Sequence, residues 1–230
     1  MTAPVLAAIE AAAALVAVAV DAGGGPRVLA SQAVATGSPR RDPMTLLAEL
    51  LAATGVPLAA LRHLVVDIGP GSYTGLRVAL AAARMLGRFV PCTVSAVTSL
   101  EVIARRTATA ERIVPGTVLV PLLEARRGRC YGGLVRVSDA GVELLGAPRC
   151  LPPAAWLSGL PDGARLCGEA ATLLLGSDLA VLPAHAADAA TLLELGRARP
   201  PVAVTTLEPL YLMVSAAEEN AAGAAEPPHA

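Results

Sequence analysis

The chain has 230 residues, of which 54% are hydrophobic and only 2% aromatic, so it can bury a largely aliphatic core in one large domain or two smaller lobes. Its basic residues are all arginine, and a formal net charge of −1 excludes the broad basic field of proteins that bind nucleic acid over a large surface. Four separated cysteines without a Cys-x-x-Cys pair, and three histidines without a His-Glu-x-x-His motif, argue against zinc chemistry and favour free thiols in a reducing, cytoplasmic compartment.

The amino-terminal residues 5–20 are almost wholly apolar. No basic residue precedes this run, Glu10 interrupts it, and it is shorter than the roughly 18 to 20 residues that a membrane-spanning helix needs. We therefore predict strands over residues 5–9 and 15–21, and a third over 28–35 after a glycine-rich turn. On propensity alone, an alanine-rich helix over residues 7–14 is an alternative.

A polar break at residues 36–43 precedes a predicted helix over 44–53. Asp42 is suited to cap it, Pro43 fits its first position, and Gly55 ends it. Either burial beneath a sheet or a helix from another subunit would explain an apolar surface that covers more than half of the circumference. The residues of that surface are Met44, Leu46, Leu47, Leu50 and Leu51.

The stretch at residues 64–86 predicts a buried strand, a tight turn and a long helix. Glycines at 69 and 71 allow a close approach or a positive φ, Pro70 fixes the backbone between them, and Ser72 or Thr74 can cap the helix. The turn either holds an anion at the helix N-terminus or simply packs strand against helix. It lacks the Gly-Lys-Ser/Thr ending of a P-loop and the Gly-x-Gly-x-x-Gly spacing.

The helix after this turn has a small-residue face and a cationic edge. Gly75, Ala79, Ala82, Ala83 and Leu86 form the face, which Leu76 and Leu80 extend. Arg77, Arg84 and Arg88 recur at i, i+7 and i+11 along the edge. The pattern fits a helix that packs on a partner and orients it by charge, or a core helix with a solvated rim.

The remaining pattern completes two α/β halves, with a composition change at residues 107–116 between them. We expect lobes at 1–106 and 107–214 and a disordered tail at 215–230. Arg126, Arg127 and Arg129 surround a hairpin turn, where they either contact phosphate or form an ordinary charged tip. The expected strands are 92–96, 117–124, 129–137, 142–150 and 165–168; the expected helices are 98–106, 152–160 with Trp156, and 187–195; and 209–211 is expected to be extended.

The string GPGSYTGLR at residues 69–77 resembles the signature of the bacterial TsaB (YeaZ) proteins, the dimerisation subunit of the tRNA threonylcarbamoyladenosine synthase complex. Residues 122–133 are similar to that family's Asp-Ala-Arg-x-x-x-Val-Tyr hairpin, and residues 208–212 to its Pro-x-Tyr-Leu segment. The resemblance covers most of residues 3–214.

This resemblance implies a two-lobed actin/Hsp70/sugar-kinase-like α/β fold and a subunit without catalytic residues, cofactor or metal of its own. ATP and metal are expected on the partners, which are a TsaD-like catalytic subunit and a TsaE-like ATPase, with tRNA contacted indirectly. A homodimer through the same helices is an alternative, and no membrane is expected. The turn at Gly69, Pro70, Gly71 and Ser72 would be structural. The implied partner contacts are Met44, Leu47, Leu51, Tyr73, Leu76, Arg77, Leu80, Ala83 and Arg84.

The chain departs from the family pattern at two places. The first strand ends in Ile9 and Glu10 where the family has Asp-Thr, and residues 39–42 replace a His-Thr/Ser pair. Two further hypotheses follow: a diverged paralogue without the usual partner, and an ATP-dependent phosphotransferase that holds Mg²⁺ through Asp67, Glu10 and Asp21. Protease chemistry finds no support, because Ser72 has no histidine nearby in the sequence.

Overall fold

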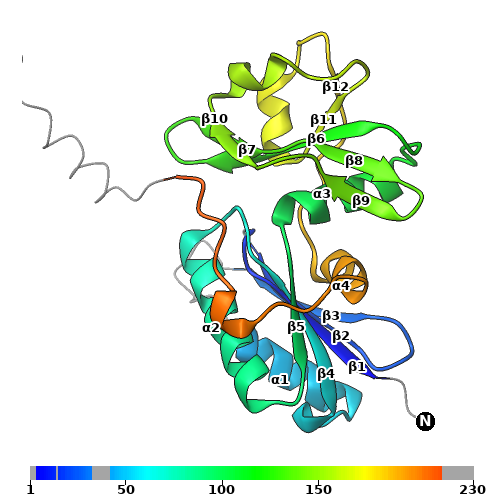
Figure 1. Cartoon of the computed structure of the whole chain (residues 1–230), viewed down its shortest axis with the longest axis vertical. Coiled ribbons are helices and arrows are strands. Elements are labelled where there is room, and N and C mark those ends of the chain that lie inside the picture. Colours follow the sequence, from blue (N-terminus) through cyan, green and yellow to red (C-terminus); the bar gives the residue numbers. More distant parts are fainter. Residues whose placement is uncertain (1–3, 14, 33–41, 214–230) are drawn as a thin grey trace, which may run out of the picture.

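The computed structural model describes residues 4–13, 15–32 and 42–213, which form two β-sheets with helices between and outside them (Figure 1). The predicted tail at 215–230 and the end of the predicted strand at 28–35 lie outside the described residues.

The first sheet has five strands in the order β3-β2-β1-β4-β5. Strands β1, β2 and β3 are antiparallel, whereas β1, β4 and β5 run parallel. Helices cover both faces of β1 and β4, which is why these strands are apolar almost throughout. The strand prediction for residues 5–9 and 15–21 is confirmed. The strands are β1 (Val5–Glu10), β2 (Leu15–Asp21), β3 (Arg27–Gln32), β4 (Leu61–Asp67) and β5 (Thr93–Val97).

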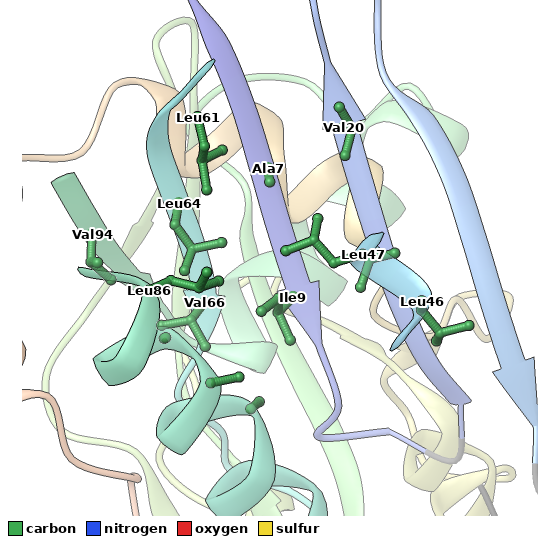
Figure 2. Close-up of a cluster of buried hydrophobic side chains, with 14 of the residues drawn as sticks. Ala7, Ile9, Val20, Leu46, Leu47, Leu61, Leu64, Val66, Leu86 and Val94 are labelled. Atoms are coloured by element: carbon green, nitrogen blue, oxygen red, sulfur yellow. The ribbon is translucent and has the colours of Figure 1, made fainter. Parts of the chain in front are cut away.

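Helices α1 (Pro43–Thr54) and α2 (Tyr73–Phe89) lie on one face of this sheet (Figure 1). As predicted, Asp42 caps α1 by accepting a hydrogen bond from the Thr45 N–H at 2.9 Å, and Gly55 ends it with φ 69°. The cap of α2 is Ser72 rather than Thr74, because the Ser72 hydroxyl accepts from the Gly75 N–H at 3.2 Å. Figure 2 shows leucines from both helices packed against the sheet in the first core cluster.

The opposite face of the first sheet is covered by α4 (Ala189–Arg197), which contacts β1, β2 and β4. Helix α3 (Ser99–Ala110) packs against α4 on one side and the second sheet on the other. It begins at the predicted cap, Thr98, but continues four residues past the predicted end at 106. A second core cluster fills this middle layer and includes residues of both sheets, among them Val65 and Leu119.

The second sheet has seven strands, with β10-β7-β6-β11-β12 in order and β8 joining β6 to β9. The single strands predicted at 129–137 and 142–150 are wrong, because each is broken in two. After Gly133 the chain moves from pairing with the end of β6 to pairing with its beginning. The strands are β6 (Val118–Ala125), β7 (Arg129–Gly132), β8 (Val135–Ser138), β9 (Gly141–Leu144), β10 (Arg149–Leu151), β11 (Arg165–Cys167) and β12 (Ala180–Val181).

Short 3-10 helices cover the outer face of the second sheet. Trp156 is fully buried there in a third core cluster, and its indole N–H donates to the Cys130 carbonyl at 3.4 Å, so it is a packing anchor. The helix predicted at 152–160 is therefore only a 3-10 segment. The segments at the second sheet are η2 (Pro153–Leu157) and η3 (Glu169–Leu174). The other two 3-10 segments are η1 (Leu58–Ala60), directly before β4, and η4 (Val204–Thr206), which contacts α2.

The four cysteines are free thiols, as predicted, and two of them, Cys130 and Cys167, are buried. No helix among the described residues has both the length and the hydropathy that crossing a bilayer would require.

Candidate functional site

The glycine-rich turn between β4 and α2 packs directly on the turn between β1 and β2. A Cβ on Gly71 would lie 2.4 Å from the Ala12 carbonyl oxygen, and one on Gly75 would lie 1.9 Å from the Ala11 carbonyl oxygen. Gly69 has φ 99° and precedes a cis peptide bond to Pro70. Glycine is therefore required for a close backbone approach, which supports the packing interpretation of the turn.

Several backbone donors of this turn are used within the chain. The Ser72 N–H donates to the Ala12 carbonyl at 2.7 Å, and the Gly75 N–H is taken by the Ser72 cap. On the facing turn, one Glu10 carboxylate oxygen accepts from the Ala12 N–H at 2.8 Å and the Ala13 N–H at 3.0 Å. An anion at this position would have to displace these bonds, including those to an existing carboxylate.

The three carboxylates considered for Mg²⁺ do not converge. Glu10 and Asp67 lie at the same end of the first sheet, since Ile9 is opposite Val66 in the register. Asp21 is opposite Leu6, at the other end of β1. It accepts from the Gly23 N–H at 2.8 Å and forms an ion pair with Arg197, and these contacts lower its pKa. This geometry argues against the phosphotransferase hypothesis.

Asp67 is fully buried and holds the glycine-rich turn in place. It accepts from the Gly69 N–H at 2.7 Å and from the Ser99 hydroxyl at 2.8 Å. Burial raises the pKa of its carboxyl to about 7. The neighbouring Glu101 completes the capping box of α3 and pairs with Arg199. Among the described residues, no group of three or more His, Cys, Asp or Glu side chains is placed to hold a metal ion.

The structure divides the predicted contact residues of α1 and α2 into two groups. Five of them have at most 4% of their surface exposed in this chain: Leu47, Leu51, Leu76, Leu80 and Ala83. All of these except Leu76 belong to the first core cluster, and their contact with a partner stays a prediction. Met44 is half-buried, and Tyr73, Arg77 and Arg84 are exposed.

A different apolar stripe of α2 faces outward. Val78 is 42% exposed, Met85 61% and Phe89 73%, and Ala81 lies exposed between them. These positions recur at i, i+3, i+7 and i+11 and so share one side of the helix. We call Val78, Ala81, Met85 and Phe89 the α2 stripe. This spacing is present in the sequence, but the prediction used the small-residue face of the same helix, which has the stronger pattern.

Helix α1 carries an apolar hollow of its own. The hollow has a volume of about 260 Å³ and is bounded by both buried leucines and exposed alanines of the helix. Helices α1 and α2 contact each other on the same face of the sheet. The lining residues are Met44, Leu47, Ala48, Leu51, Ala52, Val56 and Leu58.

The arginine edge of α2 binds the last described segment of this chain. Arg84 donates to the Leu207 carbonyl, and the Arg77 Nε–H donates to the Tyr211 hydroxyl at 3.0 Å. The Arg77 guanidinium lies 4.2 Å from the centre of the Tyr73 ring, which stacks on Tyr211 at 5.1 Å. We call residues 199–212 the strap. The strap uses two of the three arginines that the sequence assigned to a partner.

The comparisons with known proteins agree on one family. A family model described as "TsaD: tRNA N6-adenosine threonylcarbamoyltransferase" matches residues 39–183, more than half of the chain. The tRNA threonylcarbamoyladenosine biosynthesis protein TsaB of Bacillus subtilis (strain 168) is 32% identical over 118 residues, which are 51% of this chain and 47% of that protein. The match thus spans about half the length of this curated relative.

Two solved structures show the same fold. YeaZ from Pseudomonas aeruginosa aligns with a TM-score of 0.76 and 22% identity over 90% of this chain and 99% of its own. A second structure, titled as an uncharacterised protein with similarity to peptidase YEAZ from Pseudomonas aeruginosa, aligns at 0.75 and 21% over 91% and 99%. The expected two-lobed actin/Hsp70/sugar-kinase-like fold is confirmed. The chain belongs to the family that this model describes, and it is similar to TsaB of Bacillus subtilis in sequence and to YeaZ from Pseudomonas aeruginosa in fold.

Proposed function

We propose that this chain is a non-catalytic subunit that docks through α1 and α2 onto a TsaD-like catalytic subunit. Through that partner it supports N6-threonylcarbamoylation of the tRNA adenosine adjacent to the anticodon. Its membership of the family described as tRNA N6-adenosine threonylcarbamoyltransferase and its similarity to TsaB of Bacillus subtilis support the reaction class. ATP and metal belong to the partner subunits, a TsaE-like ATPase completes the assembly, and tRNA is engaged mainly through the complex.

The α2 stripe is the observation that carries this proposal. Met85 and Phe89 are large apolar side chains with 61% and 73% of their surface in solvent, one turn apart on a helix whose other face is fully buried. Exposed apolar patches of this kind mark protein interaction sites, and aromatic anchors commonly dominate their binding energy. The hollow on α1 offers a recess into which a partner side chain can insert.

The hydrogen bonds of three carboxylates argue against the alternative that this chain is a phosphotransferase. Glu10, Asp21 and Asp67 each accept hydrogen bonds from their own backbone turns, and Asp21 lies at the far end of the sheet. A phosphotransferase needs carboxylates that are free to hold a metal and activate an acceptor. A scaffold needs only the outer helix surface.

The test is co-purification of a tagged TsaD-like subunit with variants of the α2 stripe. Met85→Glu and Phe89→Glu place a charge at the centre of the proposed interface, so we expect complex formation to fall at least about tenfold. Because both side chains already face solvent, the melting temperature of the isolated chain should stay close to that of the wild type.

The matched controls are Val114→Glu and Leu175→Glu, which put the same charge on apolar side chains that are 65% and 69% exposed outside α1 and α2. Both should bind normally. Leu80→Glu is a folding control, since Leu80 is 2% exposed and its charge would enter the core. If the two stripe variants bind the TsaD-like subunit as the wild type does, this docking surface is refuted. If the wild-type chain forms only a homodimer, and the two variants weaken that homodimer, the surface serves self-association instead.

A further inference from the structure

The hairpin between β6 and β7 presents a compact cluster of guanidinium groups. Arg126, Arg127 and Arg129 lie within four residues, and all three are exposed. Arg127 and Gly128 both have positive φ, 63° and 64°, so the turn projects away from the sheet in one defined conformation. We call residues 126–129 the arginine tip.

Most arginines elsewhere in the described chain have a structural partner. Five form ion pairs, which are Arg105 with Glu194, Arg106 with Asp188, Arg136 with Glu143, Arg197 with Asp21, and Arg199 with Glu101. Arg62, Arg77 and Arg84 donate to backbone or hydroxyl oxygens. At the arginine tip, Arg126 and Arg129 form neither an ion pair nor a hydrogen bond with any described residue. The same holds for some isolated arginines of the described chain, but only at the tip do two such residues lie within four positions of each other; the isolated ones are Arg27, Arg88, Arg112, Arg149 and Arg165.

Arg126 and Arg129 are two unpaired like charges only three positions apart, and such charges repel one another unless an anion binds them. Guanidinium groups bind phosphate oxygens through two parallel hydrogen bonds, a geometry that lysine cannot match. All three arginines of the tip are exposed on a hairpin turn. An exposed turn of this kind is accessible to an extended chain of phosphates.

We propose that the arginine tip binds the phosphodiester backbone of the tRNA. This inference rests on the proposed function, which brings a tRNA to the complex, and it adds a direct contact from this subunit. Because the contact is to phosphates, it contributes affinity and orientation rather than sequence selection. It also accounts for RNA binding by a chain whose net charge is −1, since the positive charge is local.

The test measures binding of an unmodified tRNA transcript to the complex assembled from this chain and its catalytic partner, by fluorescence anisotropy over a range of salt concentrations. The double variant Arg126→Glu/Arg129→Glu should weaken binding about tenfold or more at low salt, and the slope of log affinity against log salt should fall by about two. Arg126→Lys/Arg129→Lys keeps the charge and should retain most of the salt slope with a smaller loss of affinity.

The matched control is Arg27→Glu/Arg112→Glu, which changes the net charge equally at two exposed positions outside the tip. It should bind tRNA as the wild type does, or with a small uniform loss. Equal affinity and slope for the tip variant and this control overturn the proposal, while leaving the docking function intact. Loss of complex formation rather than of RNA affinity in the tip variant also overturns it, because the tip would then bind an acidic protein surface. Failure of the wild-type chain to form any complex refutes the proposed function instead.

Discussion

At the scale of single residues, burial controls the charge of Asp67. Burial raises the pKa of its carboxyl from 3.8 to about 7, aided by the nearby Glu101 carboxylate, and outweighs the hydrogen bonds from Gly69 and Ser99. The Gly69 N–H donates to one oxygen of this carboxyl, and the Ser99 hydroxyl, which lies 2.8 Å from both oxygens, donates to them. Since the pKa of the carboxyl is raised, the folded chain binds its proton more tightly than the unfolded chain.

This linkage predicts the pH dependence of Asp67→Asn. The stabilisation from the proton is complete below the unfolded pKa of 3.8 and is lost as pH rises through about 7. The asparagine amide mimics the neutral acid at every pH, so the free energy of unfolding of the wild type should fall relative to the variant between about pH 4 and pH 7. Urea unfolding at several pH values measures this difference.

Asp42→Asn provides a control of opposite sign. Hydrogen bonds from Thr45 lower the pKa of Asp42, so its stabilisation is present above pH 3.8 and is lost as pH falls. A constant difference between wild type and Asp67→Asn across this pH range would show that Asp67 is ionised in the folded chain throughout.

Residue patterns predicted where helices begin better than which side of a helix faces the sheet. Asp42, Ser72 and Thr98 cap helices where the sequence placed caps, because a cap depends on local backbone donors. Helix α2, however, has two apolar sides. Periodicity alone does not say which side of the helix meets the sheet: the structure buries Leu80 and exposes Met85.

At the scale of elements, the packing of the strap on the first half of the fold is a feature that the sequence did not predict. The Val202 N–H donates to the Val94 carbonyl at 2.8 Å and the Leu210 N–H to the Ile68 carbonyl at 2.7 Å, so the strap crosses from β5 to the glycine-rich turn. Leu207 is 2% exposed within the first core cluster. Its contacts lie more than 100 residues away along the chain, beyond the reach of any local pattern.

The packing of Leu207 predicts that the strap stabilises the α2 face of the molecule. Leu207→Ala should lower the free energy of unfolding by about 2 to 5 kcal/mol, because the core cannot fully close over the missing side chain. It should also lower the protection of the Leu210 amide from hydrogen exchange. Val202→Ala is the control, since Val202 is 37% exposed, and its cost should be under about 1 kcal/mol. Equal costs for the two variants would mean that the strap rests loosely on α2.

The broken strands of the second sheet show a similar limit. Residues 129–137 form one continuous β-rich pattern, yet the chain changes its partner region on β6 at Gly133. A Cβ there would lie 3.2 Å from Leu144 and 3.3 Å from Leu100, side chains contributed by β9 and α3. The break is thus set by tertiary packing, which a single strand pattern does not contain.

At the scale of the whole molecule, the two sheets are joined by the second core cluster rather than by a simple linker. Helix α4 follows the second sheet in the chain but packs on β1 and β4 of the first. A Cβ on Gly196 would lie 2.1 Å from Val65, which shows how closely the helix meets that sheet. The division into lobes at 1–106 and 107–214 remains a prediction, and this packing makes its energetic consequence testable.

A shared core predicts that the two halves unfold together, and Leu47→Ala tests this from a distance. Leu47 is fully buried in the first core cluster, which contains no residue of the second sheet. If unfolding is cooperative, its loss should lower the free energy of hydrogen exchange by a similar amount, about 2 to 5 kcal/mol, in both β4 and β6. Ala48→Gly changes an exposed position on the same helix and should cost only about 1 kcal/mol. It should lower the free energy of hydrogen exchange in β4 and β6 by the same small amount. If the effect of Leu47→Ala is confined to the first sheet, the two halves unfold independently. A partner docked on α1 and α2 would then stabilise only the half that it contacts.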